Sequence, residues 1–275
     1  MMKKLCHLLC MLLVFGALTL HAQTPTPLKK VMELKMPKTI EDDMPGTRGA
    51  SVAWHPVQKK YYACFAGNAE YPLAVFDATG KRLSKEDQTA ILDTRGLWYN
   101  PATKLICGNG HGDLGWFTYI LDKAGIPTDI TMITNNQHQP GLQSVGVFNS
   151  LDKQVLFLNG SQVYMYESDG TLADSMMIHW TRKKTDGVDE DEDPTLEHED
   201  FNIYSLVYTG IKGQELGFLN ITNKQVELYD IKTGFQTKVL TFPETAVVEQ
   251  TFNFAYANGI FWLFNIELRK WVGYK

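Results

Sequence analysis

The 275-residue chain has few of the residues and motifs that usually reveal a function. It has only four cysteines, and neither C-x-x-C nor H-x-x-x-H spacing occurs after residue 22, so the sequence offers no zinc site. No G-x-S-x-G motif is present, which removes the usual sign of a serine hydrolase. There is no basic stripe and no Lys and Arg run interleaved with aromatic residues, and the net charge is −5, which argues against a nucleic-acid partner.

Long hydrophobic runs are also scarce, and the main one lies at the start of the chain. Lys3 and Lys4 precede an apolar run from Leu8 to Leu20, and a small residue, Ala22, follows. This is the order of a secretory signal peptide, and the run is shorter than the ~20 residues of a membrane span. We expect residues 1–22 to be a signal peptide and the mature chain to be exported, to the periplasm or outside the cell, with no transmembrane segment.

The four cysteines leave two questions open. Lipidation at Cys10 is an alternative to cleavage after Ala22, although Leu9 stands where a lipoprotein signal needs a small residue. Cleavage would leave Cys64 and Cys107, and an exported protein meets a compartment in which a disulfide can form. Both residues lie in short apolar segments, so they could equally be two buried small hydrophobic side chains.

Helical periodicity is nearly absent, and a repeat takes its place. Gly80, Gly125 and Gly170 are each 45 residues apart, and a fourth copy ends at Gly234, 64 residues later. Each glycine follows a short run of β-branched and aromatic residues and an acidic residue, as in Leu73-Ala-Val-Phe-Asp-Ala-Thr-Gly80. This pattern is typical of a strand followed by a tight turn.

Two further strands precede each copy, and another follows it. The first strands of the five units are predicted at Ser51–Trp54, Gly96–Tyr99, Val145–Phe148, Ser205–Tyr208 and Asn253–Tyr256. Four short strands repeated every 45 residues or so indicate the blades of a propeller. We therefore predict an all-β fold, a β-propeller of about five four-stranded blades in one domain over residues 23–275. The alternative is a β-sandwich of similar strands.

The two ends of the repeat region fit together. The last unit stops at Trp271–Tyr274, its third strand, and an unpaired strand-like run, Val31–Met36, lies near the start of the mature chain. A ring that does not close leaves exposed edges. We expect Val31–Met36 to complete the last blade.

This organisation resembles the bacterial exported propeller proteins, the broad group with NHL-type and TolB-like repeats. The resemblance covers about residues 30–275 and rests on the strand and turn pattern; the Gly-His and Trp-Asp pairs of WD-type repeats are missing. It implies a fold and little about activity.

An acidic segment, residues 181–203, is predicted to be a loop inserted between the third and fourth blades. Asp189, Asp191 and Asp193 alternate as in a calcium loop, but Pro194 stands where such loops need glycine. A solvated loop is therefore the main interpretation and Ca²⁺ binding the alternative. No other cofactor is expected.

Residues 110–115 read G-x-G-x-x-G, but a strand and not a helix follows them, so they do not indicate a dinucleotide site. The loop that contains His111 and Asp113 should instead lie on the face where loops lead into the inner strands. Propellers often bind ligands at one mouth of the channel. The candidate ligand-binding residues are Arg48, Arg95, His111, Asp113, His138, Gln143, Glu199, Asn202, Glu249 and Gln250.

Three functions follow from this organisation. The first is a non-catalytic binding or scaffold module that engages a small molecule, a glycan or another exported protein on this loop face. The second is a glycoside hydrolase, for which the candidate carboxylates around the channel are Asp43, Asp93, Glu199 and Glu249. The third is an assembly component of the cell envelope that holds other exported proteins. The missing catalytic motifs favour the first.

Overall fold

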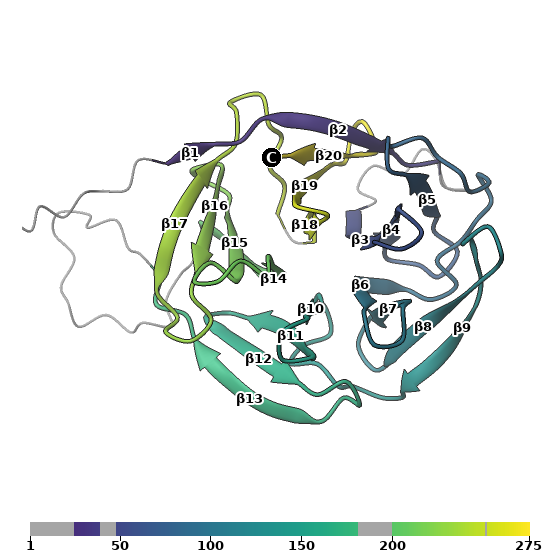
Figure 1. The fold of residues 1–275 in the computed structure, drawn as a ribbon, viewed down its shortest axis with the longest axis horizontal. Helices are drawn as coiled ribbons and strands as arrows, with labels where there is room; N and C mark the ends of the chain where they lie inside the picture. The colour runs from purple at the N-terminus through teal and green to yellow at the C-terminus, as the bar shows by residue number, and fades with distance from the viewer. Residues whose placement is uncertain (1–24, 39–47, 181–199, 251) are drawn as a thin grey trace, which may run out of the picture.

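The structure is a computed structural model that describes residues 25–38, 48–180, 200–250 and 252–275. Within these ranges the chain forms twenty β-strands and no helix, and so no helix there has the length and apolar character needed to span a bilayer. The strands form five sheets around a common axis (Figure 1). The predicted all-β propeller of five blades is confirmed.

Each blade is a sheet whose first strand lies at the axis and whose last strand lies at the rim (Figure 1). Blade 1 contains β3 (Arg48–His55), β4 (Lys60–Ala66) and β5 (Leu73–Asp77). Blade 2 contains β6 (Thr94–Asn100), β7 (Leu105–Gly110), β8 (Trp116–Leu121) and β9 (Pro127–Thr134). Blade 3 contains β10 (Val147–Asn149), β11 (Gln154–Asn159), β12 (Gln162–Tyr166) and β13 (Leu172–Met177). Blade 4 contains β14 (Phe201–Tyr208), β15 (Leu216–Asn220), β16 (Gln225–Tyr229) and β17 (Gln236–Thr241), with β1 (Thr26–Pro27) added in parallel at its outer edge. Blade 5 contains β18 (Phe254–Ala257), β19 (Ile260–Asn265), β20 (Lys270–Tyr274) and β2 (Lys30–Lys35).

The ring is closed by β2, as the sequence predicted. This strand runs antiparallel to β20, with Leu34 opposite Trp271. The Glu33 carboxylate of β2 forms an ion pair with the Lys270 ammonium group of β20, at 2.7 Å between Oε1 and Nζ. Leu34 is fully buried. Blade 5 is therefore built from both ends of the described chain.

Blade 1 differs from the expected four-stranded pattern. Residues 81–90 occupy its outermost position without forming a regular strand: they make two isolated bridges, Phe76 to Arg82 and Pro72 to Thr89, and a few separate backbone bonds such as Leu83 N–H to the Val75 carbonyl at 2.7 Å. The Ser84 hydroxyl accepts the Val75 backbone N–H at 3.0 Å and so replaces one bond of a regular ladder. A side chain thus satisfies part of this edge where the other blades use backbone.

The inserted acidic loop is shorter than predicted at its end, because β14 begins at Phe201, two residues before the predicted boundary of 203. Residues 181–199 lie outside the described ranges. These include Asp189, Asp191 and Asp193 of the calcium alternative.

Two physical constraints explain why glycine recurs at the same place in the repeat. Gly80 and Gly234 adopt left-handed backbone angles, with φ of 87° and 70°, that an L side chain rarely adopts. Both also touch the preceding blade. A methyl group on Gly80 would lie 2.7 Å from the carbonyl oxygen of Glu33, and one on Gly234 would collide with that of Met177. The glycine is needed for the turn and for the contact between blades.

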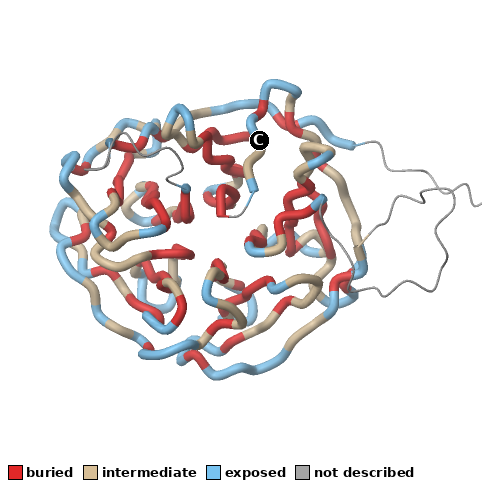
Figure 2. The backbone as a smooth tube through the Cα atoms, turned by 180° about the vertical axis from the view of Figure 1, so that it is seen from behind, coloured by how far each residue is buried: buried red, intermediate tan, exposed pale blue. Residues whose placement is uncertain are grey.

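Apolar side chains fill the space between neighbouring blades, and the buried segments gather in the inner and middle strands (Figure 2). Phe65 of blade 1 meets Phe264 of blade 5 with ring centroids 5.5 Å apart. Near the axis the blades are joined by polar bonds. The buried side-chain oxygen of Asn253 in the residues leading into blade 5 accepts the Gly49 N–H of blade 1 at 2.9 Å. These bonds satisfy backbone groups that would otherwise be buried without a partner.

Cys64 and Cys107 are free and buried. Burial raises the pKa of the Cys64 thiol to about 12 and that of Cys107 to about 11. Of the two alternatives, the structure has the buried hydrophobic side chains and not the disulfide.

Substitution of Leu34 tests the role of β2 in the ring. Leu34→Ala removes a fully buried side chain and should lower the free energy of unfolding by about 3 kcal/mol. The matched control is Val31→Ala on the same strand, where the side chain is 50% exposed and the effect should stay below about 1 kcal/mol. Urea unfolding followed by tryptophan fluorescence measures both. Equal effects of the two substitutions would contradict this account of closure.

Candidate functional site

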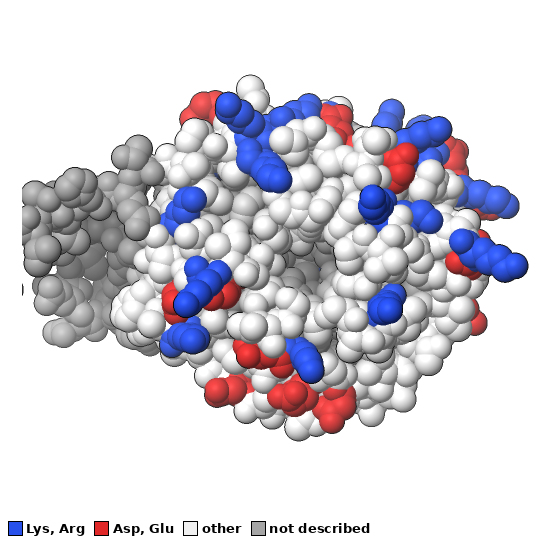
Figure 3. Space-filling model, in the orientation of Figure 1, with Lys and Arg blue, Asp and Glu red and all other residues white. Residues whose placement is uncertain are grey.

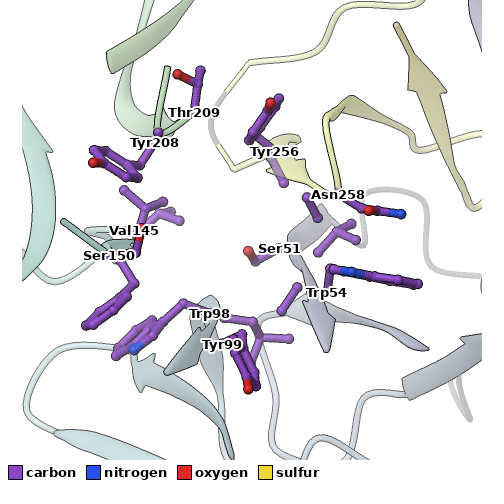
Figure 4. Close-up of a pocket in the computed structure, with 18 of the residues that line it drawn as sticks. Ser51, Trp54, Trp98, Tyr99, Val145, Ser150, Tyr208, Thr209, Tyr256 and Asn258 are labelled. Carbon is purple, nitrogen blue, oxygen red and sulfur yellow. The ribbon is translucent and has the colours of Figure 1, made fainter. Parts of the chain in front are cut away.

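A pocket of about 280 Å³ opens on the axis at the face where the inner strands end. We call it the axial pocket, and the face on which it opens the pocket face. Figure 3 shows this face, with a hollow at its centre, and Figure 4 shows the lining residues. The lining comes from the ends of all five inner strands and the turns that follow them. The five-fold arrangement therefore brings five short segments, far apart in sequence, to one place.

Each inner strand places an aromatic residue in the lining at its last or second-last position. We call this set the aromatic collar: Trp54, Tyr99, Phe148, Tyr208 and Tyr256. All five are partly exposed. The labelled collar side chains fan outward from the axis, while Ser51 lies nearer the middle (Figure 4). The collar thus borders the mouth and leaves the centre to small side chains.

Packing within blades and between neighbouring blades holds three rings of the collar in place. Trp54 lies 4.4 Å from Tyr61 and Tyr256 lies 4.7 Å from Phe261, both between ring centroids. Tyr99 meets the ring of His55 at 4.8 Å. Burial lowers the pKa of His55, which favours the neutral ring beside Tyr99 at neutral pH. One side of these rings is fixed before any ligand arrives.

The lining also offers hydroxyl groups. Ser51, Tyr99 and Tyr256 have no side-chain hydrogen bond to any residue in the described ranges, whereas the Tyr208 hydroxyl bonds to the backbone of Leu151. Burial raises the pKa of Tyr208 and of Tyr256, so both phenols stay neutral donors. The described residues of the lining include no charged side chain.

The opposite face holds most of the residues that the sequence singled out. Arg95 is its central group, with a side chain that is only 5% exposed. Its guanidinium donates to Asp93 at 2.5 Å and to Gln143 at 2.8 Å, and it lies 5.2 Å from the centroid of the Phe252 ring. The structure thus brings Arg95 and Gln143 together, in contact with one another and with one of the candidate carboxylates.

The other candidates on this face are more dispersed. His111 donates its backbone N–H to the Asp93 carbonyl at 2.8 Å, and Asp113 is exposed in the same loop. Arg48 is exposed at the start of β3, and Glu249 is half-buried. The carbonyl of Gln250 accepts the side chain of Asn253 at 2.8 Å.

Two of the predicted residues, His138 and Asn202, make hydrogen bonds to nearby backbone groups. His138 lies between the carbonyl oxygens of Gly170 and Asn135, both at 2.9 Å, so it bonds to the next blade and not to the Arg95 group. Asn202 is buried and its side-chain oxygen accepts the Tyr204 N–H at 3.1 Å within β14.

Asp43 and Glu199 lie outside the described residues, as do the aspartates of the calcium alternative. In the parts of the chain that are described, no three His, Cys, Asp or Glu side chains form a group that could hold a metal ion.

The collar residues are not among the candidate site residues predicted from the sequence, although a signal for them is present there. An aromatic residue stands one or two positions before the turn in each inner segment, as in Trp54-His-Pro, Tyr99-Asn-Pro and Phe148-Asn-Ser. An aromatic residue in a strand usually indicates packing between elements. That interpretation describes one side of each ring but not its place at the mouth.

Removal of the Asp93 charge tests whether the Arg95 group is structural. Asp93→Asn leaves a buried guanidinium without its counter-charge and should lower the free energy of unfolding by about 3 kcal/mol. Asp113→Asn, in an exposed loop of the same face, should change it by less than about 0.5 kcal/mol. Chemical denaturation measures both. Similar small effects would mean that Arg95 does not depend on Asp93 in the folded protein.

No known protein family matches the sequence, and no curated protein does either. Solved structures do share its fold. A glutaminyl cyclase from Myxococcus xanthus is 11% identical with a TM-score of 0.53, and the match covers 92% of this chain and 98% of that one.

Two further solved structures are more distant. A protein of unknown function from Bacteroides thetaiotaomicron has a TM-score of 0.46 at 12% identity, covering 84% of this chain and 60% of that one. A streptogramin B lyase has a TM-score of 0.38 at 14% identity, covering 86% and 65%. The match to the Myxococcus cyclase, at 11% identity, shows the fold alone, and functions vary on one fold. The chain is a five-bladed β-propeller with the same overall fold as the Myxococcus cyclase.

Proposed function

We propose that this protein is an exported binding propeller that holds a carbohydrate at the axial pocket. The aromatic collar carries the proposal, because five blades repeat an aromatic side chain at the same place around one mouth. The C–H groups on one face of a sugar ring carry partial positive charge, and the face of an aromatic ring is negative. A collar of such rings suits a sugar ring better than a flat hydrocarbon ligand, because hydroxyls of the lining can meet the hydroxyls of the sugar.

The size of the pocket supports a small ligand or the end of a longer one. Its volume of about 280 Å³ lies near the lower limit of small-molecule sites, roughly 300 Å³. The free hydroxyls of Ser51, Tyr99 and Tyr256 supply donors and acceptors without charge. Because the collar is already fixed by Tyr61, His55 and Phe261, binding orders few side chains, which favours affinity.

The pocket supports binding over hydrolysis. Glycoside cleavage needs two carboxyl groups about 5–9.5 Å apart. The described lining of the axial pocket contains none, and the Asp93 carboxylate is paired with Arg95 on the other face. The role as an envelope-assembly component stays a prediction that the pocket neither supports nor opposes.

Substitutions in the collar test the proposal. The mature chain, residues 23–275, is titrated calorimetrically with a panel of neutral and acidic oligosaccharides. At about 100 times its dissociation constant, a ligand that binds should stabilise the protein by roughly 2.7 kcal/mol, which thermal unfolding also detects. Tyr99→Ala and Tyr256→Ala should each weaken binding by about tenfold, the equivalent of one lost aromatic contact.

The matched control is Tyr204→Ala. Tyr204 lies on β14, the strand that also carries Tyr208, but its side chain is exposed and lies outside the axial pocket. This variant should bind like the unaltered protein. The proposal fails if no oligosaccharide binds, or if Tyr204→Ala weakens binding as much as the collar variants do.

A further inference from the structure

A second ring of side chains surrounds the aromatic collar. Four of the turns that follow the inner strands carry a lysine, and the C-terminal Lys275 places its Nζ near Gly259 in the fifth turn. We call this set the lysine rim: Lys59, Lys104, Lys153, Lys212 and Lys275. All five are exposed. Figure 3 shows Lys and Arg side chains spaced around the central hollow on this face.

The rim and the collar share one local arrangement. Lys59, Lys104 and Lys153 each follow their collar aromatic by five residues, and Lys212 follows Tyr208 by four. The aromatic side chain ends the inner strand, and the lysine lies in or just beyond the turn. The same pairing of an apolar ring and a positive charge is thus repeated around the mouth.

The rim ammonium groups have no partner within the described part of the chain. None of the five forms an ion pair or donates a side-chain hydrogen bond there. Three cations of the outer strands and turns are paired, by contrast: Lys30 and Lys270 meet Glu33, and Arg82 meets Glu86 at 2.7 Å. Five lysines without an ion pair in the described part of the chain therefore surround the mouth of the axial pocket.

Within the described ranges, the acidic residues of these turns form no ion pair with the rim lysines, although both keep their charge. Asp152 accepts the Asn149 side chain at 2.9 Å. Glu215 is buried and accepts the backbone N–H groups of Gly213 at 2.8 Å and Ile231 at 3.3 Å. Because the whole chain has a net charge of −5, the positive mouth is not a consequence of overall composition. The five rim lysines outnumber the two acidic side chains of these turns, and an excess of positive charge at a mouth attracts anionic ligands.

We propose that the ligand of the axial pocket is an acidic oligosaccharide, in which a sugar ring lies against the collar and anionic groups on neighbouring sugars meet the lysine rim. This inference rests on the proposed function and adds the charge of the ligand. A carboxylate, as in a uronic acid, or a sulfate would supply the same chemistry. Lysine suits either group, because it acts as a point charge that does not demand the planar geometry of arginine.

Matched probes separate charge from sugar. A hexagalacturonate and its fully methyl-esterified counterpart share one backbone, and only the former is charged; a heparin-derived hexasaccharide adds sulfate. Calorimetry on residues 23–275 should show that at least one acidic probe binds about tenfold more tightly than the neutral ester. Raising NaCl from 50 to 500 mM should remove most of that difference, because salt screens exposed charges.

Matched variants locate the charge. The triple variant Lys59→Gln, Lys104→Gln, Lys153→Gln should weaken acidic binding by about tenfold and leave binding of the ester unchanged. The control is Lys81→Gln, Lys123→Gln, Lys232→Gln, which removes the same charge from exposed lysines in the outer turns. It should alter binding by less than about twofold.

The outcomes distinguish the two proposals. Equal binding of acid and ester, unaffected by the rim variant, would overturn the acidic ligand and leave the carbohydrate site standing. If both triple variants lost acidic-probe binding equally, the lysine rim would also be overturned. The binding would then depend on the overall charge of the protein and not on the lysines at the mouth. Binding by the sulfated probe alone supports the rim and assigns sulfate. Binding by none of the three, together with none from the neutral panel, would overturn both proposals.

Discussion

The pairing of β2 with β20 is the contact on which the rest of this structure depends. Without it, blade 5 would have three strands and the rim of the ring an unpaired edge at the point where the chain begins and ends. Closure fixes the angle between neighbouring blades and so brings five inner strands to one axis. The axial pocket exists because those strands end together at one face. A loss of closure would therefore remove the site as well as stability.

The site itself uses one local device five times. An inner strand ends on an aromatic residue, a tight turn follows, and a lysine stands in or beside that turn. Each unit contributes little alone, because an exposed charge pair stabilises by only about 0.2–1 kcal/mol and an aromatic contact by about 0.5–1.5 kcal/mol. In the proposed function, five units around one mouth make a site whose affinity would come mainly from the collar and whose preference for charge would come from the rim. The opposite face is different in kind, because the Arg95 cation is already paired with Asp93.

Much of the fold could be predicted from the sequence because its signals are local and repeated. Gly80, Gly125 and Gly170 mark the same turn, and the missing fourth strand after Tyr274 points to Val31–Met36. The outer part of blade 1 could not be predicted, since the hydroxyl of Ser84 replaces a backbone hydrogen bond and no sequence pattern indicates such a replacement.

The candidate site was expected where polar residues gather in the loops leading into the inner strands. Whether a polar side chain is free depends on its neighbours in space, and the sequence did not reveal that Arg95, Asp93 and Gln143 bond to one another. The collar was missed for a related reason: an aromatic residue in a strand usually indicates packing, and here it packs on one side and borders the pocket on the other.

A crystal structure of residues 23–275 with a bound acidic oligosaccharide would test the central claim most directly. The account predicts a sugar ring over the axis, in contact with Tyr99 or Tyr256, with its anionic groups within about 4 Å of at least two rim ammonium groups. A ligand bound instead beside Arg95 on the opposite face, or along the outer strands of the blades, would contradict it.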